Sequence, residues 1–249
     1  MDFDVQKDRI ISVGDLIDIG PRSMECLELL EHSWFYAVRG NHEEMFLDCL
    51  AGTVAMAGRI SWEPSHKFFA YGHGAWVQDG IRDYLSPRLM RAFELVSKLP
   101  YIIVVGAGAD RYHVVHADLM RVGMQTSNRL VYGDAEIDDD FAALPMGALP
   151  EMRHSVCWSR RLMRARGPQP TVAHGLSTTY CGHTPGAALR YRRSHVCLDL
   201  GAHLPFLTPA EQAAELARYS QDGPLLCPGL AMIEPATVLC GFIRTNGST

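Results

Sequence analysis

The chain has 249 residues, of which 47% are hydrophobic and 20% charged, and this ordinary globular composition excludes a wholly disordered protein. A formal net charge of −5 offers no basic surface for nucleic acid, and no apolar run approaches the roughly 18 residues of a membrane span. Seven cysteines without a Cys-x-x-Cys pair, and a start without the features of a secretory signal, predict a cytoplasmic protein with reduced thiols.

In the first part of the chain, short apolar runs alternate with stretches of helical periodicity. Strands are predicted at 9–13 and 34–38. Helices are predicted at 23–31, with Ser23 as the candidate N-cap, at 43–50 and at 87–99. This order of strand, loop and helix predicts an α/β fold.

The second part begins with strands predicted at 101–105 and 112–115, joined by a hairpin-like link. Residues 118–174 have weak periodicity and predict loops and short helices, with the acidic stretch 134–140 as a solvated loop. Thr208-Pro209-Ala210-Glu211 is a capping box that opens a helix to about Tyr219. The remaining predicted strands are 178–181, 195–198, 230–233 and 238–243. Without a linker or repeat, the simplest organisation is one domain over 1–249, with a C-terminal helix and tail from about 208.

Four strand ends carry a small residue next to a side chain that can bind a metal ion. They are Val13-Gly14-Asp15, Arg39-Gly40-Asn41-His42-Glu43, Val115-His116-Ala117-Asp118 and Cys181-Gly182-His183-Thr184. In α/β sheets, ligands bind beyond the carboxyl ends of the strands, so side chains distant in sequence can meet there. A set of carboxylate, amide and imidazole groups suits manganese, iron or zinc. The pattern therefore predicts a divalent-metal site.

This combination resembles the calcineurin-like metallophosphoesterases, and within them the phosphoprotein phosphatase branch. The family motif Gly-Asp-x-x-Asp-Arg-Gly corresponds to residues 14–20, Gly-Asn-His-Glu is intact at 40–43, and Gly-His-Thr corresponds to 182–184. The similarity is strongest to the phage lambda-type protein phosphatases, which share Ile-Ser-Val-Gly-Asp-Leu and a Trp-x-Arg that matches Trp158-Ser159-Arg160. The resemblance implies the four-layer α/β/β/α metallophosphatase sandwich.

The resemblance also implies a set of metal ligands. Asp15 would bridge two metals, and Asn41, His116 and His183 would complete the second metal site. A pair of cations lowers the pKa of a water molecule between them and stabilises in-line attack on a phosphoryl group.

Further roles follow for the residues around these ligands. His42 would be the general acid that protonates the leaving oxygen, held and polarised by Asp18. Arg39 and Arg160 would bind phosphate oxygens, for which a planar guanidinium is well suited.

The sequence departs from the family pattern in two places. The family's first motif, Asp-x-His-Gly, ends an earlier strand, whereas the 14 residues before Asp15 contain no histidine. On this pattern the sandwich lacks its first strand and one of the two metal sites is incomplete, which indicates a misplaced start, a fragment or a degenerate copy. Ile19 occupies the position of a phosphate-binding arginine, and Arg22 is the candidate replacement.

These features predict a metal-dependent phosphoester hydrolase, similar to serine/threonine protein phosphatases, that uses metal-activated hydroxide without a covalent intermediate. The expected substrates are phosphoproteins or small phosphoesters, and the expected cofactors are divalent metal ions, with manganese first and iron or zinc as alternatives. No nucleic-acid or membrane partner is expected. Two other functions stay open: a symmetrical diadenosine tetraphosphate hydrolase, and a truncated, non-catalytic relative that binds one metal or a phosphorylated partner.

Overall fold

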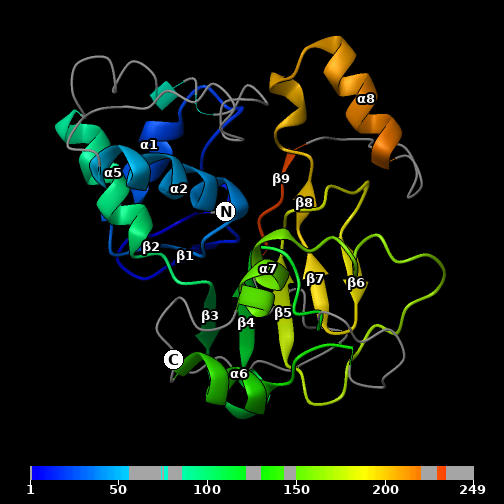
Figure 1. The fold of residues 1–249 in the computed structure, drawn as a ribbon. Helices are drawn as coiled ribbons and strands as arrows, with labels where there is room; N and C mark the ends of the chain where they lie inside the picture. The colour runs from blue at the N-terminus through cyan, green and yellow to red at the C-terminus, as the bar shows by residue number, and fades with distance from the viewer. Residues whose placement is uncertain are drawn as a thin grey trace. The chain divides into compact units, whose positions relative to one another are not determined.

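The computed structural model describes residues 2–55, 74, 76–77, 86–121, 130–142, 150–219 and 229–233 (Figure 1). The chain divides into two compact units, Met1–Pro100 and Tyr101–Thr249. The strand predicted at 238–243 lies outside the described residues. Within the described ranges, no helix has the length and apolar character needed to cross a membrane. One domain over 1–249 stays a prediction.

The first unit is built on two short parallel strands and the helices that follow them. Strand β1 (Ile10–Ser12) pairs with β2 (Phe35–Ala37), with Ile10 opposite Phe35. The other described elements are α1 (Ser23–Glu28), the 3-10 turn η1 (Leu29–Glu31), α2 (Asn41–Ala55) and α5 (Pro87–Ser97).

The core of this unit explains why these segments are helical. Leu89, Ala92 and Val96 of α5 recur at helical spacing and are all buried, as are Phe46 and Leu50 of α2. Burial of these apolar faces stabilises helices that would be marginal in isolation. The predicted strands and helices are present, and α2 begins two residues earlier than predicted.

The predicted N-cap at Ser23 is wrong. Arg22 occupies the N-cap position of α1 and makes no side-chain cap, while Ser23 is the first helical residue. The Ser23 hydroxyl instead accepts a hydrogen bond from the N–H of Asp18, at 3.0 Å. The hydroxyl thus holds the loop that precedes the helix rather than the helix end.

The second unit contains a five-stranded mixed sheet in the order β3-β4-β5-β7-β6 (Figure 1). Strands β3 and β4 form the predicted antiparallel hairpin through the 3-10 turn η2, β4, β5 and β7 are parallel, and β6 returns antiparallel to β7. Their bounds, with η2, are β3 (Ile102–Val105), η2 (Gly108–Asp110), β4 (Tyr112–Val115), β5 (Thr178–Cys181), β6 (Arg190–Arg192) and β7 (His195–Cys197). The parallel arrangement brings the carboxyl ends of β4 and β5 to the same edge.

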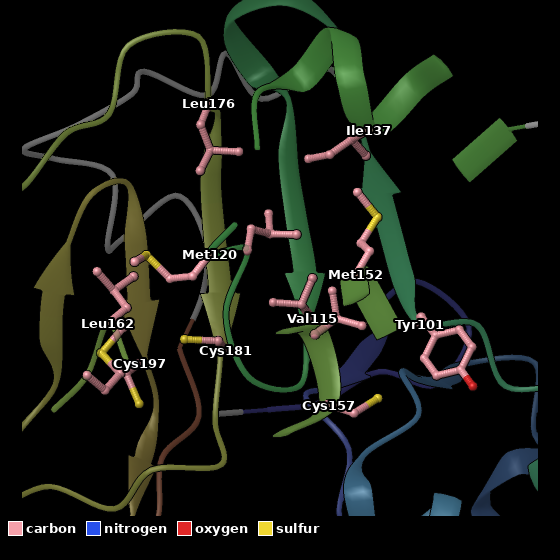
Figure 2. Packing of buried hydrophobic residues seen from close by; sticks show 13 residues of the cluster. Tyr101, Val115, Met120, Ile137, Met152, Cys157, Leu162, Leu176, Cys181 and Cys197 are labelled. Carbon is pink, nitrogen blue, oxygen red and sulfur yellow. The ribbon is translucent and has the colours of Figure 1, made fainter. Parts of the chain in front are cut away.

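Helices α6 (Asp134–Ala142) and α7 (Pro150–Trp158) contribute to the core against this sheet (Figure 2). Ile137 of α6 and Met152 of α7 lie among core residues that include Val115 and Cys181. The prediction of a loop at 134–140 is wrong, because Ile137 gives this acidic stretch a buried anchor and the segment folds as α6.

The remaining elements follow the sheet along the chain. Strand β8 (Asp199–Leu200) pairs antiparallel with β9 (Gly229–Leu230), and the 3-10 turn η3 (Leu204–Phe206) leads to α8 (Pro209–Tyr219). The capping box is present, because the Thr208 N–H donates to the Glu211 carboxylate at 2.9 Å. The predicted α/β class is confirmed in the described residues.

Candidate functional site

In the first unit, the turn after β1 is held by a buried carboxylate of α2. Glu43 is fully buried, and its Oε2 accepts the N–H groups of Asp15 at 2.9 Å and Gly40 at 2.8 Å. Its Oε1 accepts the N–H of Leu16 at 2.7 Å. A carboxylate with three backbone donors is a strong, charge-assisted anchor. Glu43 therefore fixes Asp15 relative to the first turn of α2.

The close approach of these segments explains the glycine of the Gly-Asn-His-Glu motif. A Cβ on Gly40 would clash with the Asp15 carboxylate and lie 2.7 Å from the Asp15 N and 2.8 Å from the Glu43 carboxylate. Asp15 itself has φ +54°, a left-handed conformation that side chains other than glycine adopt rarely. The chain tolerates this strained backbone conformation at Asp15, a candidate functional residue.

His42 and Asp18 form a hydrogen-bonded pair in the same unit. The Nδ1 of His42 lies 2.8 Å from Oδ2 of Asp18, whose side chain is fully buried. Oδ1 of Asp18 accepts from the indole N–H of Trp76 at 2.7 Å and from Gly74 N at 3.0 Å. The carboxylate is thus fixed by three donors, and it orients the His42 ring.

Two opposing effects act on the His42 imidazole. Burial lowers its pKa, whereas the charges of Asp15 and Asp18 and the hydrogen bond to Asp18 raise it, and the net pKa is about 9. The ring therefore keeps its proton at neutral pH in this environment. A histidine held by a carboxylate in this way is suited to donate a proton.

The other residues predicted for this region take different positions. Asn41 is the first residue of α2 and is 6% exposed. Arg39 is buried, and its guanidinium donates to the carbonyl of Ser97 at 2.7 Å and pairs with Glu44 at 3.3 Å. This guanidinium is engaged with the end of α5 rather than set toward solvent. Arg22 is exposed at the N-cap of α1.

In the second unit, two histidines face each other at the ends of β4 and β5. The Nε2 of His116 lies 3.0 Å from the Nδ1 of His183, and both side chains are buried. The Nε2 of His183 lies 3.2 Å from the carbonyl oxygen of Trp158. Because a carbonyl only accepts hydrogen bonds, this contact assigns the proton to Nε2 and leaves Nδ1 of the neutral ring with its lone pair.

This pair fits a cation site. Two nitrogen ligands at about 2.1 Å from one cation and at right angles to each other are separated by about 3 Å. Metal-bound histidines commonly donate their second ring N–H to a carbonyl, as His183 does to Trp158. The donor chemistry of His116 and His183 thus suits a divalent transition metal.

The backbone at His183 is strained. Its φ is +65°, and the Thr184 N–H donates to the Gly182 carbonyl at 2.7 Å across it, which makes a tight three-residue turn. The Gly182 N–H donates to the His116 carbonyl at 2.8 Å. Arg160 donates to the carbonyl of His183, so the predicted phosphate ligand lies directly beside a predicted metal ligand.

Sequence reasoning missed two buried carboxylates, one in each unit. Asp118 has no predicted role, yet it is fully buried and accepts from the Ser159 hydroxyl at 2.9 Å. Burial raises its pKa to about 6, against the hydrogen bonds that lower it. Glu43 is likewise part of a motif and has no predicted role of its own. The one sequence signal for these two carboxylates is their position close to His116 and His42 in the chain.

Comparisons with known proteins agree with this chemistry. Residues 3–189 match the family of calcineurin-like phosphoesterases. The chain is 31% identical over 184 residues to serine/threonine-protein phosphatase 1 of Salmonella typhimurium, covering 74% of this chain and 68% of that protein. It is 30% identical over 118 residues to serine/threonine-protein phosphatase 2 of the same organism, covering 47% of this chain and 49% of that protein.

Among solved structures, a crystal structure of a putative diadenosine tetraphosphatase matches with a TM-score of 0.40 and 21% identity, covering 81% of this chain and 74% of that chain. The family match spans most of the chain, and it includes every motif on which the predicted resemblance depends. The chain belongs to the calcineurin-like phosphoesterase family, which confirms the class of phosphoester hydrolase that its motifs predict.

Proposed function

We propose that this protein removes phosphate from phosphoserine and phosphothreonine side chains with the help of divalent metal ions, manganese first. The observation that carries this proposal is the His42–Asp18 pair, in which a fully buried carboxylate holds an imidazole at 2.8 Å. Alkoxide leaving groups such as serine and threonine are poor without protonation, so their hydrolysis gains most from a positioned acid.

The residues of the chain divide the work as follows. His42 donates a proton from Nε2 to the departing oxygen, because its Nδ1 is engaged with Asp18. Asp18 keeps the ring oriented through its own bonds to Trp76 and Gly74. Arg160, half buried beside His183, binds an oxygen of the phosphoryl group. Arg22, exposed before α1, is the second candidate for that role.

We further propose that Asp15, Asn41, His116 and His183 are metal ligands. Support comes from the family, from the 3.0 Å spacing of the two histidine nitrogens and from the tautomer that Trp158 imposes on His183. When bound, a divalent cation supplies charge stabilisation at the phosphoryl oxygens and lowers the pKa of an attacking water.

The test compares His42→Asn with His32→Asn, a matched change at an exposed histidine that stacks on Trp34 in the same unit. With a phosphothreonine peptide and Mn²⁺, we expect hydrolysis by the wild type and by His32→Asn, and none with a chelator. His42→Asn should lower kcat by about 10²-fold or more. Equal activity of His42→Asn and wild type contradicts the proposed acid.

The same assay separates the other functions. Faster hydrolysis of diadenosine tetraphosphate than of any phosphopeptide would redirect the proposal to dinucleoside polyphosphates. Phosphopeptide binding without turnover would support a non-catalytic relative. Replacing Mn²⁺ by Fe²⁺ or Zn²⁺ tests the choice of metal.

We also propose that the protein works in the cytoplasm, where its described cysteines would remain reduced. All five of them are free thiols: Cys26, Cys49, Cys157, Cys181 and Cys197. Cell fractionation with an antibody to the chain tests this.

A further inference from the structure

We propose that Asp118 is a positioning residue for His183 and acts through the segment Trp158–Arg160 at the end of α7. It does not touch His183 in this arrangement but holds the segment that does. The inference rests on the proposed function, because it concerns the preparation of His183 to bind a metal ion.

Asp118 is a fully buried carboxylate that receives four neutral donors. Oδ1 accepts from Met120 N at 3.1 Å and from the Ser155 hydroxyl at 3.5 Å. Oδ2 accepts from the Ser159 hydroxyl at 2.9 Å and from Leu162 N at 3.3 Å. Burying a carboxylate is costly, so its hydrogen bonds must be held in place by the surrounding structure. The donors at Oδ2 both come from the chain around the end of α7.

The segment that Asp118 holds contacts His183 from two sides. The carbonyl of Trp158 accepts from Nε2 of the His183 ring at 3.2 Å. The guanidinium of Arg160 donates to the His183 carbonyl. Ser159 lies between these two residues, so a shift of Ser159 away from Asp118 moves both contacts together.

His183 needs such external support. Its left-handed backbone, with φ +65°, is strained, and such conformations persist only where the surroundings impose them. Its neutral ring can carry the proton on either nitrogen, and only the tautomer with the proton on Nε2 gives Nδ1 the lone pair that a cation needs. The Trp158 carbonyl selects that tautomer, and Asp118 sets where the carbonyl lies.

The test uses Ser159→Ala, which removes the hydroxyl between Asp118 and the segment. Ser159→Thr keeps a hydroxyl and is the conservative rescue. Ser155→Ala is the matched control, because Ser155 is also a buried serine, one turn earlier. Its hydroxyl donates to the carbonyls of Met120 at 2.5 Å and Asp118 at 3.0 Å and reaches the Asp118 carboxylate only at 3.5 Å, the longest of the four contacts to that carboxylate. Asp118→Asn tests the carboxylate directly, and Ser159→Ala keeps the test valid should that variant not fold.

The first readout is the tautomer of His183 in the metal-free full chain, from long-range ¹H–¹⁵N spectra at a pH where the ring is neutral, assigned with His183→Gln. The second is Mn²⁺ affinity by calorimetry. We expect the Nε2–H tautomer in the wild type, Ser155→Ala and Ser159→Thr. In Ser159→Ala we expect a mixture of tautomers and about tenfold weaker Mn²⁺ binding.

Two results would overturn the proposal. One is an unchanged His183 tautomer in Ser159→Ala. The other is an equal loss of Mn²⁺ affinity in Ser155→Ala and Ser159→Ala, which would indicate a general structural role. A wild type that hydrolyses no phosphoester contradicts the proposed function alone, because the tautomer is measured without turnover or metal.

Discussion

Both units hold a candidate ligand in a strained backbone conformation, but the side chains that support it differ. Each presents a candidate ligand on a strained turn after a strand, Asp15 at φ +54° in the first unit and His183 at φ +65° in the second. Each also contains a fully buried carboxylate with no predicted role. Glu43 holds the Asp15 turn through backbone hydrogen bonds, and Asp118 is proposed to act on His183 through Ser159. In both units, a strained backbone at a candidate functional residue is therefore accompanied by a buried carboxylate.

The difference lies in what the carboxylate holds. Glu43 accepts three backbone N–H groups and acts on the turn directly, while Asp118 acts through the Ser159 hydroxyl and a neighbouring segment. The first unit surrounds the His42 imidazole with carboxylates, which favours its protonated form. The second unit turns two imidazoles toward each other, which suits neutral rings and a metal ion. Proton donation and metal binding therefore place opposite demands on histidine.

The largest effect should come from removing an imidazole of the second unit. His183→Ala removes one proposed metal ligand, and we expect hydrolysis at saturating substrate to fall on the order of 10⁴-fold, because cation stabilisation of the phosphoryl group is worth several kcal/mol. The Mn²⁺ concentration needed for half-maximal activity should rise. His174→Ala, at an exposed histidine of the same unit, is the control. A loss of activity without any change in Mn²⁺ dependence would mean that His183 does not act through metal binding, and the proposed difference between the units would be wrong.

The matching change in the first unit should have a different signature. Asp18→Asn weakens the hold on His42, whose Nδ1 lies 2.8 Å from the carboxylate. We expect kcat to fall on the order of 10²-fold with the Mn²⁺ dependence unchanged, since the proton donor is misoriented but no ligand is lost. Steady-state kinetics over a Mn²⁺ series measures both quantities. A shifted Mn²⁺ requirement would mean that Asp18 serves metal binding as well.

Glu43→Gln tests how much the direct anchor stabilises the first unit. A glutamine amide must set an NH₂ group against backbone N–H donors of Asp15, Leu16 or Gly40. We expect a loss of about 3 kcal/mol in the free energy of unfolding, from buried donors left without an acceptor. Urea unfolding measures it, with Glu25→Gln on the exposed face of α1 as the control. Equal stability of both variants would contradict the anchor.

The candidate site residues can be found in the sequence, whereas the buried groups that hold them cannot. The candidate ligands Asp15, His116 and His183 and the candidate acid His42 stand in short motifs at strand ends. The hydrogen bonds of Asp118 reach Ser159, 41 residues later, and no local pattern records such a pairing.

The fold shows the same division. Helix α5 follows from its periodic apolar face and agrees with its prediction to within two residues. The acidic α6 has a weak periodic signal, and its burial at Ile137 depends on the rest of the second unit. Arg39 stands next to a phosphatase motif, yet its guanidinium is bound to the end of α5 near Ser97. Contacts between segments distant in sequence determine both the burial of Ile137 and the position of the Arg39 guanidinium.

A smaller effect on the free energy of unfolding is expected at acid pH, through a buried histidine of the second unit. His195 is buried in β7, where Nε2 accepts the Leu119 N–H at 3.1 Å and burial lowers the pKa to about 4 from 6.5. The folded protein therefore binds fewer protons than the unfolded chain between these values, so stability is present above pH 6.5 and is lost as pH falls toward 4. We expect His195 to remove about 2 kcal/mol between pH 8 and pH 5.

His113, with a pKa of about 4, acts in the same direction, whereas Asp118, with a pKa of about 6, and His42, with a pKa of about 9, gain stability as pH falls and offset the loss. The measurement is urea unfolding at pH 8 and pH 5 for the wild type and His195→Gln, whose amide can accept and donate but does not titrate. The assignment is supported if His195→Gln is more stable at pH 5 relative to pH 8 than the wild type is, by about 2 kcal/mol. The same slope in both proteins would mean that the acid response lies elsewhere.

The smallest effect compares two helix caps, one in each unit. The Ser86 hydroxyl accepts the Leu89 N–H at 3.2 Å at the start of α5, and Thr208 caps α8. Loss of either cap costs about 1 kcal/mol in its helix. Because α5 buries Leu89, Ala92 and Val96, Ser86→Ala should lower the urea midpoint of the whole protein. No residue of α8 from 209 to 217 is buried, so Thr208→Ala should only fray that helix, measured as faster amide exchange in α8 at an unchanged midpoint. A lower midpoint in Thr208→Ala would show that α8 contributes to the stability of the whole protein.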